Sequence, residues 1–175
     1  MPDVYPRWKY YPAWRQPADW VSELVGIVET HRSELDSAEQ HLVSNVVLGV
    51  LRDSLERAGY EVEGDGQRIA LPALFGDEGV VLKPFFVDAF RPWDGVAIEV
   101  ESGGAMENNR VLYDLIEMSL AVNVSAGALI VPQHYSTENR QFRDQYKRAA
   151  QLFDAMWANP ERLRFPLEGV LLVGY

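Results

Sequence analysis

Apolar residues recur at helical spacing in four stretches of the chain, each of which predicts a helix with one buried face. In the second stretch, Leu42, Val46 and Val50 share a face, and Gly59 follows as a residue suited to a helix end. The four predicted helices span about Ala18–His31, Ser37–Ala58, Asn109–Ala121 and Glu138–Trp157.

Short apolar segments bounded by Gly, Pro and Asp predict the strands of a sheet. They are Tyr60–Glu63, Arg68–Leu71, Val80–Val87, Val96–Glu101, Ala126–Val131 and Gly169–Gly174. Two of them, Val80–Val87 and Ala126–Val131, are almost continuously apolar, which is typical of a sheet covered on both faces. We therefore expect an α/β (α+β) fold in which helices flank a mixed central β-sheet.

The first seventeen residues read differently, because four prolines stand among tyrosines and tryptophans. This spacing excludes a regular helix and predicts an irregular arm over residues 1–17 that packs on a single domain over residues 18–175. A chain of 175 residues is long enough for one self-supporting core. No apolar run resembles a signal peptide or a membrane span, so we expect a cytoplasmic protein.

The amino-acid composition excludes several kinds of functional site. The chain has no Cys, which excludes disulfides, thiolate metal sites and a cysteine nucleophile. Lys and Arg total 16 against 26 Asp and Glu, a net charge of −10. That balance argues against a protein that coats nucleic acid with positive charge, but it is compatible with an enzyme that gathers carboxylates around a metal.

The segment from Val96 to Glu101 carries the strongest chemical signal. Side chains alternate along a strand, so Glu99 and Glu101 should share one face while the apolar residues take the other. If the preceding strand pairs with this one as a hairpin, Asp88 lies beside Glu99. Three such carboxylates are the hard oxygen ligands that Mg²⁺ or Mn²⁺ prefers. The alternative is a solvated sheet face with Asp88 in a turn. Asp94, a rival ligand, reads more simply as part of a turn over residues 92–95.

Asp88, an apolar strand and Glu99-Val100-Glu101 resemble the PD-(D/E)xK nuclease motif. The likeness covers about residues 36–131 and is closest to type II restriction endonucleases of the BamHI and BglII kind. It implies a restriction-endonuclease-like core, with Asp88, Glu99 and Glu101 catalytic and with Asp88 and Glu99 as ligands of Mg²⁺ or Mn²⁺. Glu101 stands where the motif usually has Lys, a departure that BamHI-like enzymes share.

The resemblance also implies an acid from the helix before the hairpin, and Glu39 is the candidate. It lies three residues before Leu42 and seven before Val46, which places it on or beside the inward stripe of the predicted helix. The competing interpretation is a capping box, with Asp36 as N-cap and Glu39 at the third helical position.

Candidate nucleic-acid contacts come from two helices. Asn109 and Arg110 open the third predicted helix, where an N-terminus, an amide and a guanidinium favour an anion. Arg140, Arg143 and Lys147 fall on one face of the fourth predicted helix, a local basic patch suited to DNA phosphates. The alternatives are an ordinary N-cap and an ordinary solvated face.

The sequence thus predicts a Mg²⁺-dependent endonuclease acting on double-stranded DNA, of restriction type. The resemblance implies a homodimer and a cognate DNA methyltransferase as partners. The alternative is a non-catalytic module of the same fold that binds protein or nucleic acid. A third interpretation is a nuclease acting on RNA or branched DNA.

Overall fold

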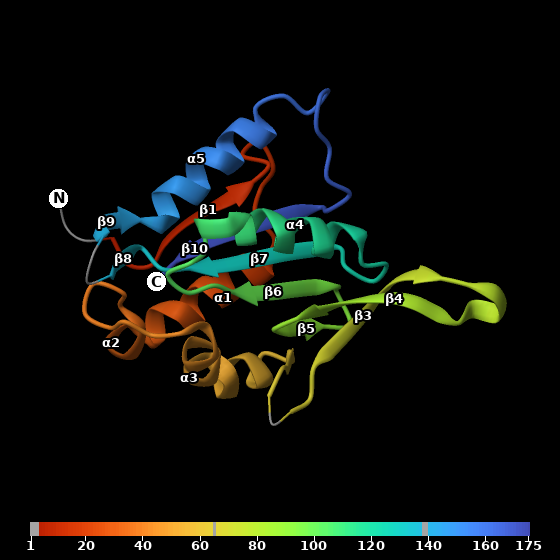
Figure 1. Cartoon of the computed structure of the whole chain (residues 1–175), viewed down its shortest axis with the longest axis horizontal. Helices are drawn as coiled ribbons and strands as arrows, with labels where there is room; N and C mark the ends of the chain where they lie inside the picture. The colour runs from red at the N-terminus through yellow and green to blue at the C-terminus, as the bar shows by residue number, and fades with distance from the viewer. Residues whose placement is uncertain (1–3, 65, 138–139) are drawn as a thin grey trace.

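A mixed sheet of six strands forms the centre of the protein in the computed structural model, which describes residues 4–64, 66–137 and 140–175 (Figure 1). The side chains of residues 108 and 136–143 are outside this description. The strand order is β1-β10-β7-β6-β5-β2, with β6, β7 and β10 parallel and the other neighbours antiparallel. Helices lie on both faces, so the predicted α/β fold with a mixed, flanked sheet is confirmed.

The strands are β1 Arg7–Tyr11, β2 Glu61–Val62, β3 Ile69–Phe75, β4 Val81–Val87, β5 Ala89–Arg91, β6 Val96–Val100, β7 Ala126–Val131, β8 His134–Thr137, β9 Arg140–Asp144 and β10 Gly169–Gly174. The helices are α1 Asp19–Thr30, α2 Arg32–Leu35, α3 Ser44–Arg57, α4 Arg110–Leu120 and α5 Gln145–Trp157, with short 3-10 turns at Asp77–Gly79 and Glu107–Asn109. Among the described residues, no helix has the length and apolar character needed to cross a lipid bilayer.

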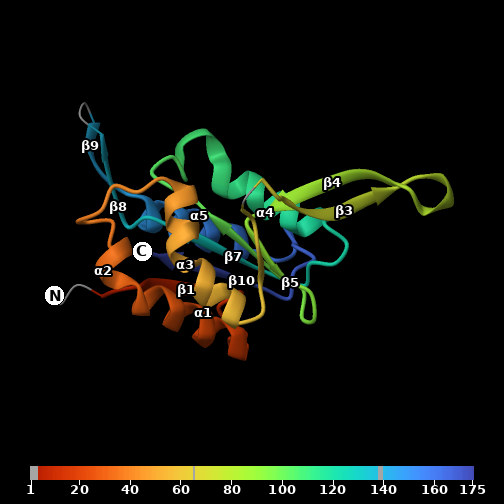
Figure 2. The same cartoon turned by 90° about the horizontal axis from the view of Figure 1, so that it is seen from below.

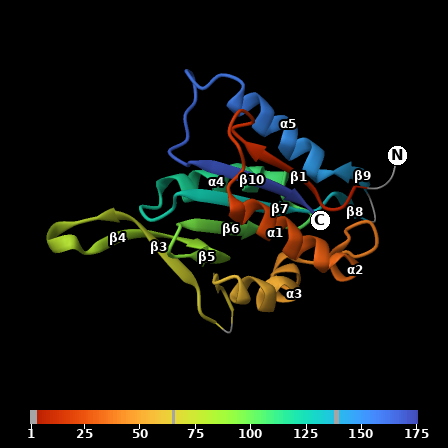
Figure 3. The same cartoon turned by 180° about the vertical axis from the view of Figure 1, so that it is seen from behind.

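The core consists of two apolar layers, one on each face of the sheet. Behind the sheet, α1, α2 and α3 pack on β6, β7 and β10, as Figure 3 shows from that side. In front, α4 and α5 pack on the opposite face of the same strands. Since the three parallel strands are buried on both faces, their near-continuous apolar sequences follow directly.

The N-terminal segment differs from the predicted irregular arm. Residues 7–11 form β1, which pairs antiparallel with β10 and completes one edge of the sheet. Tyr10 and Tyr11 are buried on opposite faces, Tyr10 with α1 and Tyr11 with α5. The prolines flank this strand and do not interrupt it, so the segment can pair despite its composition.

The second predicted helix begins later than expected, at Ser44 instead of Ser37. Ser37 is buried, where its hydroxyl donates to the carbonyl of Tyr175 and accepts the backbone N–H of His134. Asp36 caps only a turn, since its carboxylate accepts the N–H of Ala38. These contacts with the ends of β7 and β10 hold the segment in a turn, although its apolar spacing continues that of α3. The helix ends as predicted, with Gly59 at a φ of 84°.

The turn predicted at residues 92–95 is confirmed and joins β5 to β6. The Asp94 carboxylate accepts hydrogen bonds from the Arg91 guanidinium, at 2.7 to 3.1 Å, and is not part of a metal-ligand group. Arg91 is almost fully buried and also bonds Glu23 of α1 and the Ala58 carbonyl at the end of α3. This one guanidinium therefore joins two helices to the central sheet.

Candidate functional site

The predicted alternation along β6 is confirmed. Val96, Ile98 and Val100 pack into the layer of α1 and α3, while Ala97 packs into the layer of α4. Glu99 follows Ala97 on the α4 face, and Glu101 directly after the strand continues it. Two carboxyl groups therefore enter an otherwise apolar layer. This placement is costly unless other groups compensate them.

Asp88 lies at a bend between β4 and β5. The sequence predicted that the strand ending at Val87 would pair with β6, but β4 pairs with β3 and the short strand β5 is the antiparallel partner of β6. Because Ala89 is opposite Ile98, the outcome at Asp88 is as expected: its carboxyl lies beside that of Glu99 and interacts with it. Asp88 Oδ2 also accepts a hydrogen bond from the Val100 N–H, at 2.7 Å. Strand β5 begins at Ala89 and does not extend far enough to pair with Val100.

A fourth carboxyl group, that of Asp114, comes from α4 and was not predicted. Asp114 lies three residues after Val111 and four before Met118, and both of these side chains are buried against the sheet. An acidic residue within the inward stripe of a helix was the sequence signal that could have revealed it. Its carboxyl interacts with those of Glu101, Asp88 and Glu117. Here "carboxylate cluster" means Asp88, Glu99, Glu101 and Asp114.

Burial raises the pKa of every member of the carboxylate cluster, and the charges of neighbouring carboxyl groups add to the rise at Asp88, Glu99 and Asp114. Burial is the main cause throughout and raises the pKa of Asp88 to about 6 and that of Asp114 to about 8. The pKa of Glu99 is well above its usual value, because of burial and then the charges of Asp88 and Asp114. The pKa of Glu101 is also raised by burial, with the nearby Arg110 opposing the shift.

Two oxygen atoms of the cluster have no donor at hydrogen-bond distance among the described residues. Glu101 Oε2 and Asp114 Oδ2 are both buried without a hydrogen-bond partner, and Glu101 is only 8% exposed. Among the described side chains, the cation that contacts the cluster is Arg110, whose Nη1 lies 3.7 Å from Glu101 Oε2. One guanidinium that is itself 60% exposed is little compensation for four carboxyl groups. A proton or a cation between these oxygens would supply the interaction that they lack.

The donor set fits a hard divalent cation in its chemistry, since all four members offer carboxylate oxygens. The side chains as they stand do not form a finished site. Over the described residues, no group of three or more His, Asp and Glu side chains is positioned to hold a metal ion. Coordination by three of these carboxylates therefore requires rotation of their side chains, which the repulsion within the unliganded cluster opposes.

Of the two residues predicted at the start of the third helix, Arg110 lies beside the carboxylate cluster. Asn109 precedes α4 with a φ of 57° and is exposed, and Arg110 begins the helix beside Glu101. The preceding loop is held by Gln145, which is fully buried and bonds the Gly103 carbonyl and the Met106 N–H. A guanidinium at this place can meet an anion that approaches the carboxylates.

Glu39 does not occupy the position that was predicted. The residue lies in the turn before α3, with an exposed side chain, because the helix that would have aimed it inward begins only at Ser44. The capping box is not formed either, since the Asp36 N–H donates to the Arg32 carbonyl of α2. Glu39 is not among the charges that shift the pKa values of Asp88, Glu99, Glu101 or Asp114.

The prediction that Arg140, Arg143 and Lys147 share one face of a helix is wrong. Arg140 and Arg143 belong to strand β9, which pairs with β8, and α5 begins at Gln145 with Asp144 as its N-cap. Lys147 alone lies on the helix, in its first turn and exposed. Residues 138–139, where the helix was predicted to begin, lie outside the described residues, as do the side chains of both arginines. Their contact with nucleic acid stays a prediction.

A small cavity lies at the carboxyl ends of β6, β7 and β10, beside the loop that follows Glu101. Its volume is about 160 Å³. Ser102 and Gly103 line it from the loop after Glu101, His41 from the turn before α3, and His134 and Tyr135 from the segment after β7. The carboxyl ends of parallel strands are the usual place for ligands in α/β sheets. The cavity therefore lies at a position where this class of sheet commonly binds ligands, although no side chain of the carboxylate cluster lines it.

Comparison of the chain with protein-family models found no matching family, and comparison with curated protein sequences found no match. The residues and geometry of the carboxylate cluster are therefore the features that bear on function.

Proposed function

We propose that the protein is a divalent-metal-dependent endonuclease that hydrolyses phosphodiester bonds of double-stranded DNA, of restriction type. The observation that carries this proposal is the carboxylate cluster, in which buried oxygens of Glu101 and Asp114 lack a donor. A pure structural role gives no reason to gather four mutually repelling carboxyl groups in one apolar layer.

The connectivity around the cluster supports the same proposal. Along the chain, helix α3 precedes the antiparallel strands β5 and β6, of which β6 carries the acidic residues. The crossover helix α4 and then strand β7, which is parallel to β6, follow. This is the order expected for the PD-(D/E)xK resemblance of Asp88, Glu99 and Glu101. A shared connectivity supports a fold and does not by itself assign a reaction.

In this proposal Asp88 and Glu99 hold Mg²⁺ or Mn²⁺, which when bound polarises the phosphoryl oxygen and lowers the pKa of a water. Glu101, in place of the usual Lys, accepts the proton of the attacking water, and its raised pKa suits a general base. Asp114 orients Glu101 from α4, and Arg110 binds a phosphate oxygen at the mouth of the site.

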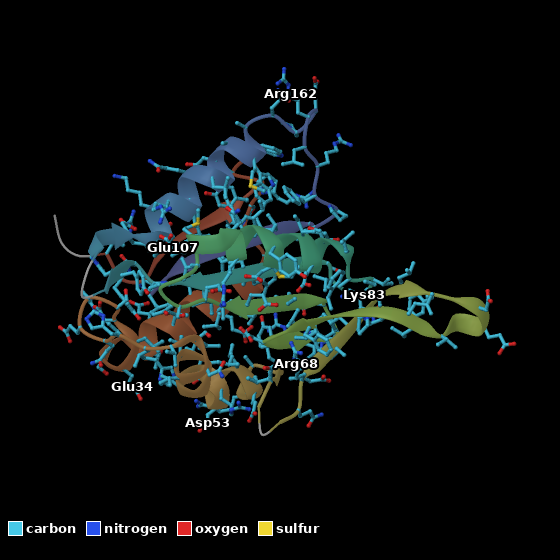
Figure 4. The ribbon with its side chains drawn as sticks, viewed as in Figure 1. Glu34, Asp53, Arg68, Lys83, Glu107 and Arg162 are labelled. Carbon is cyan, nitrogen blue, oxygen red and sulfur yellow. The ribbon has the colours of Figure 1, made fainter. Side chains whose placement is uncertain are left out.

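The test is incubation of the purified protein with mixed-sequence phage DNA, with and without Mg²⁺ or Mn²⁺. Asp88→Asn and Glu99→Gln keep the size of each side chain and remove its charge. Asp53→Asn, an exposed carboxylate on α3 (Figure 4), is the matched control for loss of one negative charge. We expect metal-dependent cleavage that both cluster variants lose and the control retains.

The pattern of cleavage distinguishes the substrates. Discrete fragments indicate a sequence-specific endonuclease, whereas a smear indicates a non-specific nuclease, and the same assay on RNA and branched DNA covers the remaining substrates. If no nucleic acid is cut and calorimetry detects no binding of Mg²⁺ or Mn²⁺, the catalytic proposal fails.

A non-catalytic module that binds protein or nucleic acid is the second candidate. The observation that favours it is that no three metal-ligating side chains among the described residues are in place together. Such a module would bind no metal, and neutralising Asp88 would leave its binding unchanged. Calorimetry on the wild type and on Asp88→Asn therefore separates the two functions.

A further inference from the structure

The hairpin of β3 and β4 projects from the body of the protein as a separate two-stranded sheet, called here the hairpin arm (Ile69–Val87; Figures 1 and 2). Its outer half carries five large apolar side chains that are 46 to 62% exposed. They are Leu74, Phe75, Val80, Val81 and Leu82.

This apolar surface is unusual in two respects. Leu74 and Phe75 are consecutive on one strand, as are Val81 and Leu82 on the other, so both faces of the ribbon are apolar and uncovered. An isolated two-stranded ribbon is marginally stable in water and gains from packing against another element. The accessible surface of 9763 Å² also exceeds the roughly 8,600 Å² expected for a compact chain of 19.8 kDa.

A second apolar surface lies beside the base of the arm. Tyr113, Ile116 and Leu120 follow one another at helical spacing on the outer face of α4, and Val122 continues them. All four are 44 to 60% exposed. The Val122 N–H donates to the Pro72 carbonyl of β3, which joins this outer face of α4 to the arm. The chain therefore presents a projecting apolar arm and an apolar helix face on one connected surface.

The charge of the arm argues against nucleic acid as the group that covers it. Asp77 and Glu78 form the tip, and Lys83 is the only basic residue from Ile69 to Val87. Phosphates would meet net negative charge at the point of first contact. An apolar protein surface suits the five exposed apolar side chains of the arm better, and the same chain offers one on α4.

We propose that two copies of the chain associate about a two-fold axis, with the hairpin arm of each lying across the outer face of α4 in the other. In a two-fold dimer each contact occurs twice, so an arm and a helix face on one chain satisfy both halves of the interface. This proposal does not depend on the catalytic one, because it uses none of the residues of the carboxylate cluster.

The available apolar area matches this use. Nine side chains, each about half exposed, offer on the order of 400 Å² if a whole side chain presents roughly 100 Å². A standard interface buries about 800 Å² per partner, of which somewhat more than half is apolar. The arm and the outer face of α4 together therefore supply about the apolar share of one stable interface.

The first test is the mass of the full chain in solution, measured by sedimentation over a range of concentrations. We expect a dimer for the wild type and a monomer for the double variant Phe75→Lys/Leu82→Lys. Both positions are exposed at the end of the arm, so the circular dichroism spectrum should stay unchanged. Leu163→Lys is the matched control and should remain dimeric, because Leu163 is exposed and follows Arg162, which Figure 4 shows away from the hairpin arm.

The second test uses the absence of Cys from the chain, which makes each introduced Cys the only thiol. Leu82→Cys and Ile116→Cys are prepared separately, mixed and oxidised. We expect a disulfide-linked dimer that contains one chain of each kind, because the arm of one copy meets α4 of the other. A Leu163→Cys chain mixed with Leu82→Cys should give no such dimer.

Three results would overturn the proposal. One is a wild type that sediments as a monomer at every concentration, and another is a dimer that survives Phe75→Lys/Leu82→Lys. The third is a monomeric wild type whose binding to duplex DNA, measured with Ca²⁺ in place of Mg²⁺, is lost in that double variant. That last outcome would assign the arm to nucleic acid.

Discussion

The carboxyl group of Asp88 is a charge in the carboxylate cluster and also the acceptor for a backbone N–H of β6. The strand β5 ends its pairing with β6 at Ala89, and the Asp88 side chain then receives the Val100 N–H. A side-chain oxygen at this point keeps the end of β6 in place. The position therefore has a structural requirement and a chemical one, and two substitutions can separate them.

Asp88→Asn should preserve the hydrogen bond from Val100 through its amide oxygen, and Asp88→Ala should lose it. Leaving that N–H without a partner costs about 1–3 kcal/mol, so we expect the Ala variant to be less stable than the Asn variant by this amount. Urea denaturation measures the difference. Equal stabilities would contradict the structural role, whereas nuclease activity should be lost in both variants.

The raised pKa of Asp114 predicts a dependence of stability on pH. In the unfolded chain this carboxyl titrates near its usual value of 3.8, and in the folded protein near 8. Between these values the folded state binds more protons, so the free energy of unfolding falls as the pH rises. Burial next to Glu101 therefore makes Asp114 destabilising at neutral and alkaline pH.

Asp114→Asn removes this titration. At about pH 4, near the pKa of the unfolded chain, the variant and the wild type should unfold at similar temperatures, since Asp114 is then protonated in the fold and largely protonated in the unfolded chain. Near pH 8 to 9 the variant should melt higher, by on the order of 10 °C, because each pKa unit of the shift corresponds to about 1.4 kcal/mol. Thermal unfolding followed by circular dichroism, with Asp53→Asn as control, measures both. A constant difference at all pH values would mean that Asp114 is charged throughout.

At the scale of elements, Arg91 of β5 joins α1 and α3 to the central sheet. Its side chain is 6% exposed, bonds Glu23 and Asp94, and lies over the rings of Tyr60 and Trp93. The guanidinium fork fits these partners as a lysine ammonium would not.

Arg91→Ala should lower the free energy of unfolding by about 2–4 kcal/mol. Loss of a buried ion pair costs about 3–5 kcal/mol, and the partial exposure of Glu23 and Asp94 reduces that cost. Arg57→Ala, an exposed arginine on α3, should stay within about 0.5 kcal/mol. Chemical denaturation of both variants tests the network. A similar small loss in each would mean that Arg91 contributes only as a surface charge does.

Two element boundaries show where local patterns failed. Residues 37–43 and 140–144 both continue the apolar spacing of the helix that follows them, and neither segment is helical. The first is held by hydrogen bonds of Ser37 to the C-terminal residue and to the segment after β7. In the second, residues 140–144 pair with β8, and Asp144 caps α5 through the Lys147 N–H. These partners lie far away in the chain or across a strand pair, so periodicity could not reveal them.

For the whole molecule, a bound divalent cation should stabilise the fold. At a free concentration one hundred times Kd, binding to the folded state alone adds about 2.7 kcal/mol. The carboxylate cluster would release protons as the cation binds, because its pKa values are raised. We therefore expect Mn²⁺ to raise the melting temperature, and more so at pH 8 than at about pH 5.

The combined variant Asp88→Asn/Glu99→Gln should show no such stabilisation, while Asp53→Asn should respond as the wild type does. Calorimetry in two buffers of different ionisation enthalpy measures the protons released. A melting temperature that Mn²⁺ raises equally in the wild type and the combined variant would place the metal elsewhere on the acidic surface.

The sequence by itself determined the fold class, most element positions and the shared face of Glu99 and Glu101, because these follow from local periodicity. The strands Ala126–Val131 and Gly169–Gly174 were confirmed at their predicted bounds. Only the tertiary structure decided the membership of the carboxylate cluster. Asp114 entered it because α4 crosses β6, and Glu39 lay outside it because Ser37 bonds the end of β10. Contacts between segments distant in sequence depend on how layers pack, and that information is absent from the spacing of residues along one segment.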